Sequence, residues 1–206
     1  MSGKAKEERD WPSYYAKTGF RPPRATLLRA LDAFAAEFPT DRARLAVDLG
    51  CGNGRDVVEM LRRGWRVLAI DAERSAIDGL LARPDLPPDP RLETLVSRFE
   101  DADWPTADLV NSSFALPFCP PDRFPELWQR IIASLRPGGR FSGQLFGDRD
   151  SWVGRQGITF LDRTEVDMIL AGLTIEHLEE EEDDGTTPRG TPKHWHIWHI
   201  VVRKPA

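Results

Sequence analysis

The residues with the clearest chemical meaning lie at positions 47–54, which read Val-Asp-Leu-Gly-Cys-Gly-Asn-Gly. Three glycines directly after an apolar stretch let the backbone approach a ligand closely and then open a helix. A second acid, Asp71, follows Asp48 by 23 residues and ends the next apolar stretch. A carboxylate at that distance is suited to accept hydrogen bonds from a ribose diol. The pattern therefore predicts a ligand that contains a nucleoside.

The charge of Asp48 and the spacing of the glycines restrict what that ligand is. A dinucleotide would set its pyrophosphate on the turn, where Asp48 would repel it. The glycines also stand at i, i+2 and i+4, whereas the dinucleotide fingerprint has them at i, i+2 and i+5. S-adenosylmethionine has no phosphate, and it carries an ammonium and a sulfonium that an acid attracts. We therefore expect S-adenosylmethionine, and a dinucleotide-dependent oxidoreductase is the disfavoured alternative.

Around this turn the sequence alternates between short apolar runs and amphipathic stretches. Apolar residues recur at helical spacing from Leu27 to Phe38, and Pro39 ends that run. Thr164 is a plausible cap for a later helix. The expected strands cover 45–47, 67–70, 92–96, 107–111, 140–146, 173–178 and 195–202. The other expected helices cover 57–61 (closed by Gly64), 73–82, 124–135 (closed by Pro-Gly-Gly at 137–139) and 164–172.

This order of elements predicts an α/β fold with a Rossmann-like, mostly parallel seven-stranded sheet. Helices cover both faces, and the terminal hairpin adds one antiparallel strand near the edge. Ligands of such sheets bind outside the carboxyl ends of the strands. Residues 27–206 are expected to form a single domain. Residues 1–26 are too few to fold alone, so they form either a lid over the site or a strap across the domain.

Composition excludes several classes of protein. The 206 residues are 40% hydrophobic and 30% charged, which suits a globular domain with its own core. A net charge of −5 disfavours a nucleic-acid partner, and no apolar run is long enough to span a membrane. Two cysteines and a charged N-terminus suit a cytoplasmic protein without disulfides. We expect a monomer or homodimer that holds no metal.

The motifs in their order resemble a class I S-adenosylmethionine-dependent methyltransferase. The resemblance rests on residues 48–54, on Asp71, and on Leu-Arg-Pro-Gly-Gly at 135–139 before the fifth strand. It covers the chain from about Leu27 onward, and the Gly-Asn-Gly-Arg turn is similar to that of the small tellurite-resistance-type branch. The glycine motif with Pro-Gly-Gly downstream is fairly specific for the superfamily, but it does not specify a substrate.

The resemblance implies a set of cofactor-binding residues. Asp48, Gly50 and Gly52 would line the methionine and the sugar, and Asp71 would hold the ribose hydroxyls. Phe99 and Glu100 match positions that contact adenine, although family members more often have Asp in place of Glu100. The reactive groove would open at Asn111 and Ser112. The full set of expected cofactor contacts comprises Asp48, Gly50, Gly52, Asn53, Asp71, Ala72, Phe99, Glu100 and Asn111.

Several polar and aromatic segments near the strand ends are candidates for binding the methyl acceptor. The loop at 114–121 is either an apolar wall beside the cofactor or a packed crossover. The loop at 147–152 has the composition of a substrate loop, or it is simply solvated. The candidate substrate contacts are Tyr15, Arg24, Phe114, Asp148, Arg149, Trp152 and His194.

Two further segments of the C-terminal region allow more than one interpretation. His194 and His196 face one way on a strand and His199 the other. No acid or third ligand stands at a fixed spacing from them, so packing is expected rather than metal binding. The six acids at 179–184 are expected to lie in a solvated loop that joins the last two strands.

These observations predict a methyltransferase that acts on a small molecule by in-line displacement. The sulfonium is already a good leaving group, so alignment and desolvation can supply most of the catalysis, and no catalytic acid or base is assigned. The alternatives are a protein methyltransferase, a tellurite or selenite methyltransferase, and a catalytically silent module that binds S-adenosylmethionine.

Overall fold

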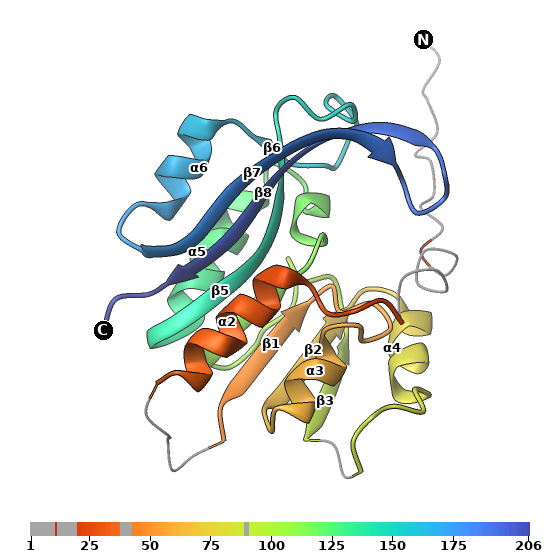
Figure 1. The fold of residues 1–206 in the computed structure, drawn as a ribbon, viewed down its shortest axis with the longest axis vertical. Helices are drawn as coiled ribbons and strands as arrows, with labels where there is room; N and C mark the ends of the chain where they lie inside the picture. The colour runs from red at the N-terminus through yellow and green to blue at the C-terminus, as the bar shows by residue number, and fades with distance from the viewer. Residues whose placement is uncertain (1–10, 12–19, 38–42, 89–90) are drawn as a thin grey trace.

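A computed structural model describes the protein at residue 11 and at residues 20–37, 43–88 and 91–206. A single sheet runs through the domain in the strand order β3-β2-β1-β4-β5-β8-β7 (Figure 1). All its pairs are parallel except those that β8 makes with β5 and β7. This confirms the predicted sheet with one antiparallel strand. The strands are β1 (Leu45–Leu49), β2 (Arg66–Asp71), β3 (Leu92–Val96), β4 (Ala107–Ser112), β5 (Leu135–Gly147), β7 (Thr174–Thr186) and β8 (Pro192–Arg203).

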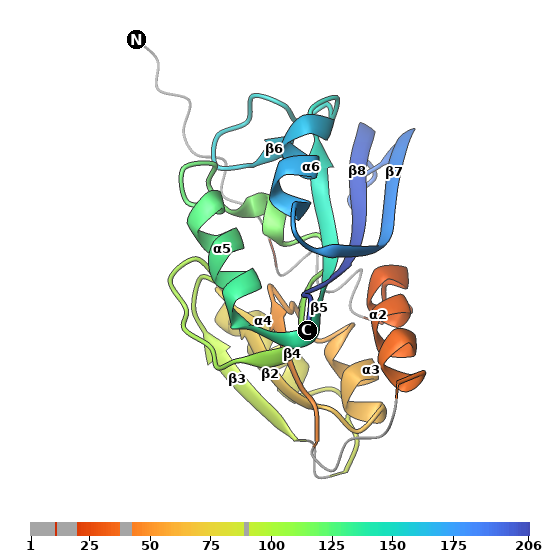
Figure 2. The same cartoon turned by 90° about the vertical axis from the view of Figure 1, so that its left-hand side faces the viewer.

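Helices cover both faces of the sheet, as predicted (Figure 2). One face packs against α2 (Ala25–Ala35), α3 (Val57–Arg62) and α4 (Arg74–Leu81), and the other against α5 (Phe124–Ser134) and α6 (Arg163–Leu170). The helix α2 buries Leu27, Leu31 and Phe34, which recur every three or four residues and so form one apolar face. The strands β1 and β4 are buried almost throughout, because both of their faces are covered.

Three predicted boundaries are wrong. The helix α6 is capped by Asp162, not Thr164, because Asp162 forms a reciprocal capping box with Glu165. The helix α5 ends at Ser134, so residues 135–139 already belong to β5, where an irregular register against β4 takes up the extra residues. A two-residue strand, β6 (Phe160–Leu161), pairs with β5 and was not predicted. The helix α2 ends at Ala35, with Ala36 as its C-cap, so it stops before the predicted end at Pro39.

The C-terminal hairpin is longer than expected and includes the acidic run. Residues 179–184 lie within β7 and pair with residues 194–199 of β8, so the connecting loop is much shorter than predicted. Figure 1 shows the two strands as a long curved hairpin that extends beyond the carboxyl end of β1. The prediction of a solvated acidic loop failed because cationic groups brought close by the fold balance these acids, as described below.

Two further observations limit the class of protein. Within the described ranges, no helix combines the length and the apolar character that crossing a bilayer requires. Cys51 and Cys119 are both buried free thiols.

Candidate cofactor and acceptor site

A row of polar side chains crosses three strands on the face that α2 covers. Asp48 of β1 stands beside Asn111 of β4, and Asn111 stands beside Ser142 of β5. The Asn111 amide donates to Asp48 Oδ1 at 2.8 Å, and the Ser142 hydroxyl donates to Asn111 Oδ1 at 2.7 Å. All three side chains are buried. Buried polar groups are kept only when they are hydrogen-bonded, and this row satisfies that requirement from strand to strand.

A second buried carboxylate, Asp56, completes this cluster and was not predicted. Its Oδ2 accepts from Ser113 Oγ at 2.5 Å and from the Asn111 amide at 3.3 Å, and its Oδ1 accepts from the Arg24 backbone N–H at 3.0 Å. Asp56 stands at the N-terminus of α3 but makes no capping bond with its side chain. Its carboxylate is instead hydrogen-bonded within the cluster, beside Asn111 and Ser113.

Asp48 sits in an environment that disfavours its charge. Burial, together with the nearby charges of Asp56 and Asp71, raises the pKa of Asp48 well above its usual value, and only the Asn111 hydrogen bond opposes this shift. Among the described residues, no cationic side chain pairs with Asp48 or Asp56. A bound cation would relieve this repulsion, so the electrostatics suit a positively charged ligand.

The glycine turn is held in shape by Asp71. The Gly52 N–H donates to Asp71 Oδ2 at 2.8 Å, and the Glu73 N–H donates to Oδ1 at 2.9 Å. Gly50 has a φ of +72°, and a Cβ there would lie 2.3 Å from Cβ of Ala115. Only glycine fits both constraints. The turn therefore lies directly against the segment that follows β4, which brings Asp71 and the Asp48 cluster to one edge of the sheet.

The remaining predicted cofactor residues surround this turn. The Asn53 carbonyl accepts from Arg83 at 3.1 Å, and Ala72 is exposed beside Asp71. Phe99 is half-buried, and its ring comes within 3.7 Å of the position that a Gly50 Cβ would take. Glu100 is buried and accepts from Arg98 Nε at 2.7 Å. These residues lie near the turn, and their contacts with adenine remain a prediction.

Phe114, directly after β4, has a strained backbone at the edge of the cluster. Its φ of +56° is the one positive value found for a residue other than glycine in the described chain. The Phe114 N–H donates to Gln144 Oε1 at 3.2 Å, and Gln144 in turn donates to Thr26 Oγ1 at 2.8 Å. The Arg24 guanidinium stacks on the Phe114 ring at 4.2 Å. Strain of this kind persists where surrounding contacts impose it, and it is frequent at ligand sites.

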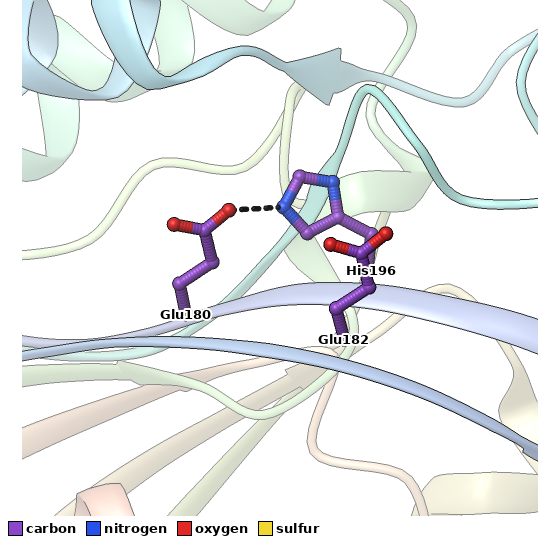
Figure 3. Close-up of side chains that lie close together, drawn as sticks. All are labelled: Glu180, Glu182 and His196. Carbon is purple, nitrogen blue, oxygen red and sulfur yellow. Dashed lines mark hydrogen bonds and ion pairs between the residues drawn. The ribbon is translucent and has the colours of Figure 1, made fainter.

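The other substrate candidates lie elsewhere on the hairpin. Arg149 binds Glu182 at 2.7 Å and also pairs with Glu180, and it lies 3.1 Å from His196 Nε2. Figure 3 shows Glu180 and Glu182 on either side of His196, to which Glu180 bonds at 3.0 Å. Acids therefore do accompany the His-x-His pair, contrary to the sequence interpretation. They come from the neighbouring strand, and the Arg149 guanidinium already supplies the positive charge among them.

Local packing explains why this outer cluster forms. A Cβ on Gly147 would collide with the His196 ring at 2.0–2.3 Å, so glycine at that position leaves room for the imidazole. His194 binds Asp184 at 2.7 Å and Glu182 at 3.2 Å, which raises the pKa of His194. Arg149 lowers the pKa of Glu182 to about 2. The candidates Asp148, Arg149 and His194 thus belong to one ion-pair network, on the hairpin face opposite His199.

The loop that follows β5 is fastened to β8 by a buried lysine. Lys193 pairs with Asp150, and its ammonium lies 4.2 Å from the Trp152 ring and 4.3 Å from the Trp195 ring. Burial lowers the pKa of Lys193. Trp152 also packs on Phe118 of the loop at 114–121, so that loop is a packed crossover at this point. Trp11 contacts the same Phe118 ring at 5.0 Å.

The structure thus brings together only part of the predicted acceptor site. Arg24 and Phe114 lie beside Asp48, Asn111 and Asp56, whereas Trp152 and the outer cluster do not contact them. Tyr15 lies outside the described residues. Asp56 could have been singled out in the sequence, because an acid two residues after the glycine turn opens the next helix and points to the same strand edge.

Comparison with known proteins gives a consistent result. The family described as a methyltransferase domain matches residues 46–139, the segment that contains the glycine turn, Asp71 and Asn111. Carboxy-S-adenosyl-L-methionine synthase of Citrifermentans bemidjiense is 33% identical over 99 residues, which cover 45% of this chain. The match spans only 40% of that relative's length.

Solved structures share the fold over most of the chain. TehB from Haemophilus influenzae superimposes with a TM-score of 0.73 at 16% identity, covering 94% of this chain and 67% of that one. A second structure is Burkholderia thailandensis 1,6-didemethyltoxoflavin-N1-methyltransferase, solved with 1,6-didemethyltoxoflavin and S-adenosylhomocysteine. It superimposes with a TM-score of 0.65 at 20% identity, covering 94% of this chain and 81% of that one. The shared fold includes the terminal hairpin, because so little of this chain is left uncovered.

Proposed function

We propose that this chain, whose residues 46–139 match the methyltransferase domain family and whose fold resembles that of TehB, is a class I, S-adenosylmethionine-dependent enzyme that methylates a small molecule by in-line transfer. The observation that carries the proposal is the pair of buried carboxylates, Asp48 and Asp56, which no cationic side chain of the described chain neutralises. A ligand with an ammonium and a sulfonium fits that cradle.

Each residue of the site has a distinct task in this proposal. Asp48 and Asp56 attract the positive charges of the cofactor, the glycine turn admits its sugar, and Asp71 accepts hydrogen bonds from the ribose. Asn111 keeps the two carboxylates at a fixed separation by donating to both. S-adenosylmethionine supplies a methyl group on a sulfonium. The thioether that remains after transfer is a good leaving group, so no acid is needed. The protein contributes alignment and the exclusion of water.

A small acceptor is favoured by the residues that border the cluster. Arg24 and Phe114 form a compact aromatic and cationic corner, and Gln144 anchors the Phe114 backbone from within the core. Such a corner suits a planar or anionic molecule more than an extended polypeptide. The Burkholderia relative also acts on a small heterocycle, as its name states.

Calorimetry with S-adenosylhomocysteine and NAD side by side tests the cofactor. We expect S-adenosylhomocysteine to bind and NAD not to bind. Label from S-adenosyl-L-[methyl-14C]methionine, incubated with a protein-free metabolite extract, should appear in small products. Binding without any transfer would identify a silent module, and binding of NAD alone would contradict the proposal.

We further propose that residues 27–206 form one domain and that the N-terminal segment closes over the site. The described part of this segment is fastened near the glycine turn. The Pro22 carbonyl accepts from Arg55, the Arg24 N–H donates to Asp56, and Trp11 packs on Phe118. Deleting residues 1–20 should therefore weaken binding of S-adenosylhomocysteine more than it lowers the melting temperature. The reverse result would identify a structural strap.

The proposed setting is the cytoplasm, as a monomer or homodimer without a nucleic-acid partner. Two buried free thiols suit a reducing compartment. The net charge of −5 disfavours binding to phosphate backbones.

A further inference from the structure

All four histidines of the chain lie in the β7–β8 hairpin, and each is paired with an acid of β7. His194 and His196 belong to the outer ion-pair network. His177 and His199 are on the opposite face, which α2 partly covers. Of these two, only His199 contacts the proposed site, because its ring meets Phe114 edge-on at 6.3 Å.

The strand register shows how close His199 is to the cofactor residues. His199 pairs with Gln144, and Val201, two residues further along β8, pairs with Ser142 of the polar row. His199 therefore stands one step beyond that row, toward the carboxyl ends of the parallel strands. At the same level, Gln144 holds the Phe114 backbone. The imidazole thus borders the corner where Phe114 and Arg24 would receive the acceptor.

The hydrogen bond to Glu181 determines which ring nitrogen is available. His199 Nε2 lies 2.7 Å from Glu181 Oε2. An ionised carboxylate can only accept a hydrogen bond, so the ring nitrogen that faces it must carry the proton. In the neutral ring, Nε2 is then the donor and Nδ1 carries the lone pair. No described residue forms a hydrogen bond with Nδ1. The His199 side chain is 19% exposed, so the imidazole as a whole is not sealed within the core.

We propose that His199 is the general base of the reaction, held in the required tautomer by Glu181. This inference rests on the proposed function. As the acceptor's O–H or N–H atom forms its bond to the methyl carbon, the carbon–sulfur bond breaks and its electron pair remains on sulfur, leaving a neutral thioether. The acceptor's proton passes to His199 Nδ1, and the imidazolium then pairs with Glu181. One positive charge is lost at sulfur and one is gained at His199.

This assignment specifies the acceptor class. A base is useful only when the attacking atom carries a proton, as in a hydroxyl or an N–H group. An oxyanion such as selenite, or a halide, attacks through a free lone pair and needs no base. The inference therefore favours hydroxyl or N–H acceptors over the tellurite and selenite alternative.

Glu181 of β7 pairs with His199, Glu179 stands opposite His199 in the strand register, and His177 of the same strand interacts with it electrostatically. Burial, followed by the charge of Arg29, lowers the pKa of His177. His177 pairs with Glu179 at 3.2 Å, yet it makes no ring contact with Phe114. It is therefore a matched control with the same chemistry one step further from the site.

The first test requires no acceptor. Nitrogen-15 NMR of the imidazoles in the folded protein, recorded at a pH where the His199 ring is neutral, should show His199 protonated at Nε2 and bare at Nδ1. The His199 signals should move when S-adenosylmethionine is added, and those of His177 should move less. A proton on Nδ1, or a His199 signal that ignores the cofactor while calorimetry records its binding, would overturn the inference.

The second test compares variants in transfer of labelled methyl to phenol, aniline, iodide and selenite. His199→Gln should reduce transfer to phenol or aniline about 100-fold to 10,000-fold, with unchanged affinity for S-adenosylhomocysteine and loss of the rising limb of the pH profile. Glu181→Gln should cause a smaller loss, and His177→Gln should cause none.

Each other outcome contradicts a specific statement. Equal transfer to phenol or aniline by His199→Gln and wild type, or wild-type transfer to iodide or selenite alone, would overturn the role of His199. Binding of S-adenosylhomocysteine without transfer to any probe or extract component would overturn the proposed function, and this inference with it.

Discussion

The molecule contains two concentrations of acidic residues, and they are built in opposite ways. Asp48, Asp56 and Asp71 lie buried around the glycine turn, and backbone N–H groups, an amide and a hydroxyl provide the hydrogen bonds described for them. The acids at 179–184 are exposed on β7, and neighbouring arginine and histidine side chains balance them.

The difference shows which acids await a partner from outside the chain. Exposed acids that already have countercharges would gain little free energy from a cationic ligand, since surface ion pairs contribute at most about 1 kcal/mol. Buried acids without a countercharge destabilise the free protein, and a cationic ligand removes that penalty. The buried group is therefore expected to govern cofactor binding and the exposed group to govern only local stability.

The strongest expected effect is loss of cofactor binding when Gly52 of the glycine turn is replaced. Gly52 has a φ of +54°, where a branched side chain is strained, and it belongs to the turn that is proposed to admit the sugar of the cofactor. Gly52→Val should abolish calorimetric binding of S-adenosylhomocysteine while circular dichroism still shows a folded domain. Gly64→Val is the control, because Gly64 also has a positive φ but faces open space. Normal binding by Gly52→Val would mean that the turn is only structural.

Removing a buried carboxylate should cause the next largest effect. Asp71→Ala is expected to weaken S-adenosylmethionine binding by about 1.5–3 kcal/mol, the usual range for hydrogen bonds to a charged group. Because Asp71 also holds the Gly52 and Glu73 N–H groups, Asp71→Asn should be measured beside it. Unchanged affinity in a folded Asp71→Ala protein would remove Asp71 from the cofactor site.

The raised pKa of Asp48 predicts that binding depends on pH. A cationic ligand favours ionised Asp48, so binding should release a proton, and affinity should rise by up to about tenfold per pH unit until Asp48 is ionised in the free protein. The stability of the free protein should instead fall as pH rises. A carboxyl whose pKa is raised by folding favours the folded state only while it is protonated, so that contribution is lost as pH rises through the raised pKa.

Asp48→Asn should flatten both trends. Calorimetry of S-adenosylmethionine in buffers of different ionisation enthalpy measures the proton release, and thermal melts measure stability. Equal pH slopes for wild type and Asp48→Asn would show that another group is responsible.

The smallest effect is expected on the hairpin. Arg149→Ala should lower the melting temperature by no more than about 2 °C at neutral pH, with unchanged affinity for S-adenosylhomocysteine. The stabilisation of the folded protein that Glu182 contributes is present above the ordinary pKa of a glutamate and is lost as pH falls toward about 2. The stabilisation that His194 contributes is present below the ordinary pKa of a histidine and is lost as pH rises through the raised pKa of His194. A large loss of binding would place Arg149 in the site.

Local patterns were sufficient to predict the parts of the molecule that depend on neighbouring residues in the sequence. The glycine turn, the strand that ends at Asp71 and the order of strands and helices are all specified within short segments. Apolar runs bounded by glycine and acid indicate buried strands directly. The fold, and the position of the glycine turn at the carboxyl ends of the strands, therefore followed from the sequence.

The unpredicted features depend on residues far apart in the chain. Asp56 becomes part of the cluster only because Arg24, 32 residues before it, and Ser113, 57 residues after it, donate to its carboxylate. The acids of β7 were assigned to a loop because their countercharges come from Arg149 and from histidines on another strand. No spacing rule for a single segment contains that information. The same holds for His199, whose position follows from its pairing with Gln144.

The placement of β7 at the end of the sheet has a consequence for how copies of the protein behave at high concentration. A terminal strand offers unpaired backbone groups on which a second chain can extend the sheet. Six consecutive acids on this strand outnumber the single arginine that pairs with them in the described chain, so like-charge repulsion between two copies is expected to oppose such growth. We therefore expect the hairpin to resist edge-to-edge association at neutral pH. This protection disappears in acid, where protonation removes the charge and leaves a long, regular strand exposed.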